Sequence, residues 1–149
     1  MKPSSAKAKG KKLEDYIADK LISKGIDLKA RRDGASGAGI REKGDIITSA
    51  SIFGRNLGIE AKNHKTPHIK DWWKQAQKLE LLGREPVLAY KLENEQYEEA
   101  KVVIYLNTFL DMVKALSEIS KPETNNLQKE KDINSYPKQQ IKFWLNKIK

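Results

Sequence analysis

An aspartate followed fifteen residues later by a Glu-x-Lys triplet constrains the fold of this chain more than any other feature. The aspartate is Asp45, and the triplet lies in the run Ile59-Glu60-Ala61-Lys62. The segment between them, with glycines at its centre, reads as two short strands joined by a turn. Because successive side chains of a strand point to opposite faces, Ile59 and Ala61 can enter a core while Glu60 and Lys62 stand together on the other face. If Asp45 opens the neighbouring strand, its carboxylate can lie beside them.

The chemistry of this grouping is that of phosphate hydrolysis. Two carboxylates and an ammonium that converge on one spot suit a hard divalent cation, a water nucleophile and a phosphate. The pattern therefore indicates a metal-dependent nuclease. A plainer interpretation stays open at this point: Glu60 and Lys62 could form a solvated ion pair on one face of a hairpin, because short motifs of abundant residues arise by chance.

The composition favours a polyanionic partner. The 149 residues include 29 Lys and Arg against 20 Asp and Glu, a formal net charge of +9, which favours nucleic acid ahead of membrane. The absence of cysteine excludes disulfides, thiolate zinc sites and cysteine nucleophiles. No apolar run has the length of a signal peptide or a membrane span, so we expect an intracellular, cytoplasmic protein.

Hydrophobic periodicity predicts one α/β domain with a mixed central sheet flanked by helices. The expected order is helix, three strands, helix, strand, strand, helix, at about 12–24, 26–32, 45–52, 57–63, 68–83, 86–90, 101–106 and 107–119. We expect a basic disordered tail at 1–11, the nuclease domain at 12–119, a polar linker at 120–136 and an amphipathic helix at 137–149. The apolar stripe of that last helix could dock on its own domain or pack across a dimer interface.

Five segments in a fixed order carry a resemblance to a known family. They are Glu14, eleven residues before Gly25; Arg32 with Asp33-Gly34-Ala35-Ser36-Gly37; Gly44-Asp45; Ile59-Glu60-Ala61-Lys62; and Gly83-Arg84-Glu85-Pro86-Val87-Leu88-Ala89-Tyr90-Lys91. Together they resemble the PD-(D/E)xK nuclease superfamily, specifically the archaeal-type Holliday junction resolvases and related phage endonucleases, over residues 10–106. The family more often has Pro-Asp where this chain has Gly44-Asp45. The resemblance implies a restriction-endonuclease-like core.

The resemblance also implies roles for the triplet and its aspartate. Asp45 and Glu60 would bind Mg²⁺ or Mn²⁺, with help from the backbone carbonyl of Ala61, since hard cations take oxygen ligands. Lys62 would orient the attacking water or stabilise the negative charge that develops on the phosphate.

Further residues have two open interpretations each. Glu14 could assist the metal site or be an ordinary glutamate in the first turn of a helix, and Ser36 could hold the scissile phosphate or be a turn residue. Five cations could contact the DNA backbone or be solvated charges: Arg31, Arg32, Arg41, Lys43 and Lys65.

The aromatic and histidine residues after the triplet favour packing over chemistry. His64 and His68 are four apart, but Pro67 between them argues against one continuous helix that presents both, so we expect neither to be a metal ligand. Trp72 fits the core stripe of its helix, and Trp73 falls off it, where it could stack on a base but is more typically half-buried. The roles of the glutamines at 75 and 77 stay open.

The sequence therefore predicts a Mg²⁺-dependent endonuclease for branched DNA, with Holliday junctions as the first choice of substrate. A homodimer is implied by the resemblance and by symmetry, because cutting two opposed strands of a four-way junction needs two equivalent sites. The alternatives are a phage or restriction-like nuclease with another DNA substrate, or an inactive DNA-binding module on the same fold.

Overall fold

A computed structural model describes residues 3–34 and 44–120 of the chain. The chain divides into two compact units, Met1–Leu106 and Asn107–Lys149, and the first contains every described strand. Helix α3 (Leu106–Ser120) falls almost wholly in the second unit, so the unit boundary lies earlier than residue 119, where the nuclease domain was predicted to end. The predicted linker and C-terminal helix, at 120–136 and 137–149, lie outside the described residues apart from residue 120.

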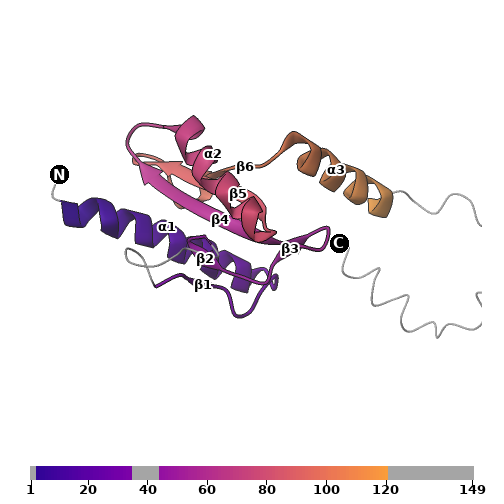
Figure 1. Ribbon diagram of the computed structural model, residues 1–149. Helices are drawn as coiled ribbons and strands as arrows, with labels where there is room; N and C mark the ends of the chain where they lie inside the picture. Colours follow the sequence, from indigo (N-terminus) through magenta and orange to yellow (C-terminus); the bar gives the residue numbers. More distant parts are fainter. Residues whose placement is uncertain (1–2, 35–43, 121–149) are drawn as a thin grey trace, which may run out of the picture. The chain divides into compact units, whose positions relative to one another are not determined.

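A curled, mixed sheet of four strands is the centre of the first unit (Figure 1). Its order is β3 (Ser51–Ile52), β4 (Arg55–His64), β5 (Glu85–Leu92) and β6 (Lys101–Val103). Strands β4 and β5 are parallel, while β3 and β6 run antiparallel to their neighbours. A separate antiparallel pair consists of β1 (Arg31–Arg32) and β2 (Ile46–Ile47). The predicted α/β architecture, consistent with a restriction-endonuclease-like core, is confirmed.

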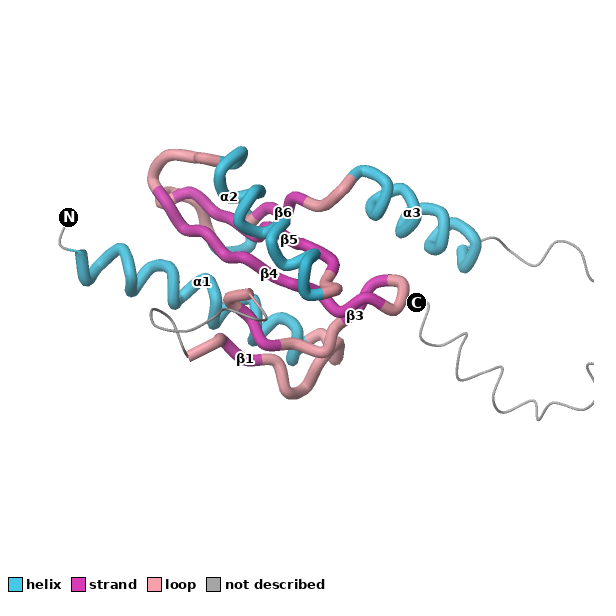
Figure 2. Tube along the Cα trace, viewed as in Figure 1, coloured by secondary structure: helices cyan, strands magenta, loops and turns pink. Residues whose placement is uncertain are grey.

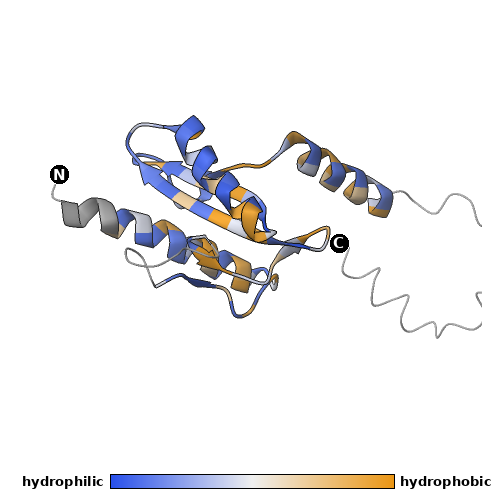
Figure 3. Cartoon of the chain, in the orientation of Figure 1, coloured by the Kyte–Doolittle hydropathy of each residue, from blue (hydrophilic) through white to orange (hydrophobic). Residues whose placement is uncertain are grey.

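Two helices cover opposite faces of β4 and β5 because side chains alternate along these strands. On one face, Ile59 and Val87 pack with Ala18 of α1 (Pro3–Ser23). On the other, Leu88 packs with Trp72 and its neighbours on α2 (Ile69–Gln77). The hydropathy colouring shows that the apolar residues of α1 gather toward its C-terminal end (Figure 3). The core is therefore two layers of side chains on the two faces of one sheet.

The crossover between the parallel strands depends on a close contact at Gly58. Helix α2 continues as a 3₁₀ helix, η1 (Lys78–Leu82), which ends at Gly83 in the left-handed conformation, with φ 71°. A Cβ atom on Gly58 would lie 2.8 Å from the Cβ of Leu79, so only glycine lets η1 approach β4 this closely. A second 3₁₀ turn, η2 (Tyr97–Glu99), joins β5 to β6.

The hairpin of β3 and β4 has a tight two-residue loop at Phe53 and Gly54 (Figure 2). Both residues have positive φ, 49° and 78°, as a type I′ turn requires. Glycine adopts this conformation without strain, whereas the Cβ of Phe53 makes it costly. The phenylalanine ring is also 60% exposed, so little packing offsets that strain.

The first helix begins earlier than the sequence predicted. It runs from Pro3, not from about residue 12, so the prediction of a disordered tail is wrong for residues 3–11. Proline is well suited to the first helical position, and the alanines and lysines that follow are good helix formers. Tertiary contacts add support. The side chain of Lys9 pairs with Glu93. The backbone carbonyl of Lys9 accepts a hydrogen bond of 3.2 Å from Nδ2 of Asn63.

Other element boundaries differ locally from the prediction. The strand expected at 26–32 is reduced to β1, and the one expected at 45–52 is interrupted between β2 and β3. The interruption follows a side-chain contact: Asp27 accepts hydrogen bonds from the Thr48 hydroxyl and the Ser49 amide, at 2.7 and 2.8 Å. A side chain that satisfies backbone donors in this way competes with regular strand pairing.

Candidate active site

Strand β4 places the triplet at the centre of the sheet. Glu60 is paired with Leu88, Ala61 with Ala89 and Lys62 with Tyr90 on the parallel neighbour β5. Ile59 belongs to the core cluster beneath α1, and Ala61 is buried. Glu60 and Lys62 point to the opposite face, as alternation requires. The expected orientation of the four residues is therefore observed.

Asp45 is held against the backbone of the triplet by two hydrogen bonds. Its amide donates to the carbonyl of Ile59 at 2.8 Å, and its Oδ2 accepts from the amide of Ala61 at 2.8 Å. The residue is 7% exposed. The carboxylate thus lies one hydrogen bond from the residue that separates Glu60 and Lys62, which is the proximity that the sequence predicted.

Gly44 sets the approach of this aspartate. Its φ is 81°, and a Cβ atom here would lie 2.5 Å from the carbonyl oxygen of Ile59. Proline, more frequent at this position in the family, is restricted to φ near −65° and cannot adopt this conformation. The substitution of glycine for proline is therefore matched to the backbone that delivers Asp45 to β4.

Glu60 and Lys62 form an ion pair that is largely, though not fully, withdrawn from solvent. The Nζ of Lys62 lies 2.6 Å from Oε1 of Glu60, and their side chains are only 17% and 8% exposed. Taking two charges out of water costs several kcal/mol per ion, which the mutual attraction only partly recovers. Ion pairs withdrawn from water in this way are frequent at functional sites. The interpretation as a solvated surface pair is thus inconsistent with the structure.

Glu14 lies on α1 and is partly buried. Arg32 faces this part of the helix, and its Nε is 4.0 Å from Oε2 of Glu14 and 3.7 Å from Oδ1 of Asp15. Within residues 3–34 and 44–120, no group of three or more His, Cys, Asp or Glu side chains is arranged to hold a metal ion. The structure thus brings together Asp45 and Glu60 but does not add Glu14 as a third ligand, and its metal role stays a prediction.

The predicted DNA-contacting cations have different surroundings. Arg31 and Arg32 are adjacent in β1 and so point to opposite faces: Arg32 faces the acids of α1, while Arg31 is exposed. Lys65 is exposed after the end of β4. Ser36, Arg41 and Lys43 lie outside the described residues.

The two histidines contact the ring of Trp72. Centroid distances are 5.2 Å for His64 and 5.9 Å for His68, and both are exposed. The pKa of His64 is lowered, mainly by its partial burial and then by the positive charges of Lys62 and His68. That neither histidine is a metal ligand stays a prediction.

The neighbouring aromatic and glutamine residues have structural contacts. Trp72 is buried in the core as predicted, and Trp73 is half-buried, with its ring against Tyr105 at 5.1 Å. Nε2 of Gln77 donates to the Tyr105 hydroxyl at 2.9 Å, whereas Gln75 is exposed.

The chemistry of the donors fits a hard divalent cation. Asp45 and Glu60 supply carboxylate oxygens within one buried neighbourhood, and oxygen is the ligand that Mg²⁺ and Mn²⁺ prefer. The burial of two acids beside each other is costly unless positive charge compensates it. Lys62 supplies one such charge, and a bound cation would supply more.

Comparison with known proteins gives one decisive result. A family model described as "Phage putative PDDEXK endonuclease" matches residues 5–149. The chain belongs to this family. Comparisons with curated proteins and with solved structures find no significant match.

Membership of this phage endonuclease family settles the coarse activity. The chain is a nuclease of the PD-(D/E)xK type, a class that acts on DNA and generally uses divalent metals. No helix in the described residues is long and apolar enough to cross a membrane.

Sequence reasoning missed one buried carboxylate, that of Asp27. Besides Thr48 and Ser49, it accepts a hydrogen bond from the amide of Lys29 at 3.0 Å. These donors, above all the Thr48 hydroxyl, hold its pKa at about 2. The short-range contact with Lys29 is typical of an Asx turn and could have been recognised. Thr48 and Ser49 are 21 and 22 residues from Asp27, so no local sequence pattern predicts these two hydrogen bonds.

Proposed function

We propose that this nuclease is a Mg²⁺- or Mn²⁺-dependent endodeoxyribonuclease that hydrolyses phosphodiester bonds in branched DNA, with four-way junctions as its principal substrate. The observation that carries the proposal is the convergence of two buried carboxylates and a half-buried ammonium on one backbone segment. Asp45 accepts from the Ala61 amide, and the Glu60–Lys62 pair flanks the same residue. Charges are rarely buried this way unless they are used.

Each residue has a distinct part in the proposed reaction. Asp45, Glu60 and the Ala61 carbonyl would hold the cation, which when bound lowers the pKa of a coordinated water and neutralises charge on the phosphate. Lys62 would orient the water or donate to the oxygen on which negative charge develops. The hydrogen bond from Ala61 and the buried position of Asp45 keep that carboxylate fixed, which is the preorganisation that such catalysis requires.

Charge and symmetry support the proposed substrate and assembly. The net charge of +9 favours binding to the DNA backbone whatever its sequence. Structure-specific cleavage needs recognition of shape, for which phosphate contacts suffice. Symmetric cuts in a four-way junction would require a homodimer with one site per subunit. An intracellular location follows from a DNA substrate.

The test is cleavage by the purified full chain with Mg²⁺ or Mn²⁺ on labelled four-way junction, duplex, flap and single-stranded DNA. Asp45→Asn and Glu60→Gln should abolish cleavage but leave DNA affinity unchanged or higher, because each removes a negative charge. The matched control is Asp71→Asn on the exposed side of α2, which should cleave normally.

Two results would contradict the proposal in different ways. Cleavage near the wild-type rate by Asp45→Asn or Glu60→Gln would remove these residues from the active site. Efficient cleavage of duplex or flap DNA with no preference for junctions would keep the nuclease but replace the substrate. DNA binding with no cleavage under any condition would instead favour the inactive binding module.

A further inference from the structure

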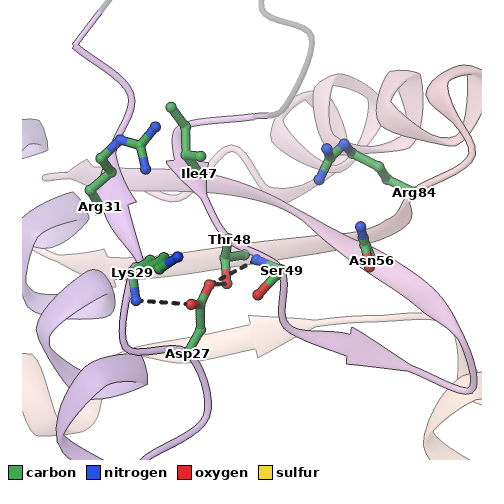
Figure 4. Close-up of a pocket in the computed structure, with 8 residues that line it drawn as sticks. All are labelled: Asp27, Lys29, Arg31, Ile47, Thr48, Ser49, Asn56 and Arg84. Atoms are coloured by element: carbon green, nitrogen blue, oxygen red, sulfur yellow. Dashed lines mark hydrogen bonds between the residues drawn. The ribbon is translucent and has the colours of Figure 1, made fainter.

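A pocket of about 280 Å³ lies beside β1 and β2 (Figure 4). Three cations line it: Lys29, Arg31 and Arg84. Figure 4 shows Lys29 and Arg31 on one side of the pocket, with Arg84 and Asn56 on the other. At roughly 30 Å³ per water molecule, the space holds about nine waters, so a phosphate group and part of its sugars can enter.

The pocket contains one carboxylate, and its oxygens are already occupied. Asp27 accepts from the Thr48 hydroxyl and from the amides of Ser49 and Lys29. The same donors hold its pKa at about 2, so it is ionised at neutral pH. Three cations and one aspartate leave a formal charge of 3 − 1 = +2 around the pocket. Its net charge therefore attracts anions.

The three pocket cations also differ from the cations beside them. Arg32 faces the acids of α1, and Arg55 pairs with Glu85 at 2.9 Å. In contrast, no ion pair joins Lys29, Arg31 or Arg84 to an acid in the part of the chain that the structure describes. Their charges thus remain available to a ligand.

The pocket is also held in shape. Nη1 of Arg84 donates to the carbonyl of Leu57 at 3.1 Å, and the carbonyl of Arg84 accepts from Arg55 at 2.9 Å. On the other side, the hydrogen bonds of Asp27 fix the turn before β1 to the segment after β2. A binding site whose walls are already ordered loses less entropy when its ligand arrives.

We propose that this pocket binds a backbone phosphate of the DNA substrate a few nucleotides from the bond that is cut. This inference rests on the proposed function. Guanidinium groups such as those of Arg31 and Arg84 match the geometry of phosphate oxygens, and the amide of Asn56 offers another donor. Thr48 follows Asp45 by three residues, roughly 10 Å along an extended chain, so one DNA strand can reach both sites.

The experiment compares two charge-matched double variants of the full chain. Lys29→Gln/Arg31→Gln removes two pocket cations, and both residues are exposed, so the fold should be unaffected. Lys24→Gln/Lys70→Gln removes two exposed lysines, one directly after α1 and one on α2. Affinity for a labelled four-way junction is measured by fluorescence anisotropy over a range of salt concentrations without divalent metal, and cleavage is measured in parallel with Mg²⁺.

The pocket variant should bind the junction about tenfold more weakly, since a hydrogen bond to a charged group contributes at least about that factor. The negative slope of log affinity against log salt should become shallower by about 0.9, the value for one phosphate contact. The control variant should keep the wild-type slope. Arg84→Gln, tested separately with its urea midpoint as a check on folding, should repeat the change in slope.

Equal slopes for the pocket and control variants, with a wild type that binds and cleaves DNA, would overturn this inference and leave the proposed function intact. A wild type that neither binds nor cleaves DNA would overturn both. A free phosphate ion could occupy the pocket in place of a phosphate of the DNA backbone. If inorganic phosphate raises the melting temperature of the wild type but not of Lys29→Gln/Arg31→Gln, while the DNA slopes are equal, the pocket is a small-anion site and the DNA inference is wrong.

Discussion

Replacing Lys62 with methionine tests whether the central ion pair is truly buried. The substitution keeps most of the apolar stem and removes the ammonium that lies 2.6 Å from Glu60. Glu60 then keeps a buried negative charge without this partner. Removing one partner of a buried pair costs about 3–5 kcal/mol of unfolding free energy. Because 17% of the Lys62 side chain is exposed and water can reach its end, we expect a loss near about 3 kcal/mol, the lower limit of that range.

A double-mutant cycle separates the pair from its surroundings. Glu60→Gln/Lys62→Met carries no charge at either position, so it should be more stable than Lys62→Met alone. Urea unfolding followed by tryptophan fluorescence measures Lys62→Met, Glu60→Gln and the double variant, because buried Trp72 reports the loss of the core. With a slope of about 1–3 kcal/mol per molar urea, the Lys62→Met midpoint should fall by roughly 1–3 M. The control is Lys101→Met, which loses a more exposed pair with Glu95 and should keep the wild-type midpoint.

A wild-type midpoint for Lys62→Met would refute the reasoning, because it would mean that water solvates the pair. The same variant also tests the proposed role of the lysine. It should lose cleavage but still bind Mn²⁺ in calorimetry, since both carboxylates remain. Loss of metal binding would instead make Lys62 a structural residue.

Three further predictions concern the fold. Trp72→Ala should lower the unfolding free energy by about 3–5 kcal/mol, whereas Trp73→Ala should cost less because Trp73 is only half-buried; urea unfolding compares them. Phe53→Asn should raise the unfolding free energy by about 1 kcal/mol, because asparagine tolerates positive φ, and an unchanged or lower urea midpoint would contradict this. Asp27 should stabilise the fold above pH 3.8 and lose that contribution as the pH falls toward about 2, so acid unfolding of Asp27→Asn should be less steep in that range.

The orientation of the triplet could be predicted from the sequence because it depends on a local rule. Alternation along a strand places Ile59 and Ala61 against one layer and Glu60 with Lys62 on the other, whatever the neighbours are. The parallel strand β5 was recognisable for a similar reason: a short apolar run after a helical pattern is typical of a β-α-β crossover.

The features that sequence reasoning missed depend on contacts between distant residues. Strand β2, which follows Asp45, ends where the Thr48 hydroxyl donates a hydrogen bond to Asp27, a residue 21 positions earlier in the chain. The different surroundings of Arg31 and Arg32 follow from the docking of α1 on β1, which adjacent arginines do not reveal. The requirement for Gly44 likewise arises from the carbonyl of Ile59 on another strand. Local patterns carry no signal for such contacts until the strands are placed beside each other.

The two proposed sites would divide chemistry from affinity in a way that mutation can separate. At the proposed active site, the carboxylate of Asp45 accepts a hydrogen bond from a backbone amide and that of Glu60 pairs with Lys62, so two negative charges face one positive charge. The cations of the pocket have no such acids within the described residues and can contribute to binding before any bond is broken. Changes at Asp45 or Glu60 should therefore reduce turnover at constant affinity, whereas changes at Lys29 or Arg31 should reduce affinity and the salt slope. A variant of either kind that produced the opposite pattern would show that the two sites are not independent.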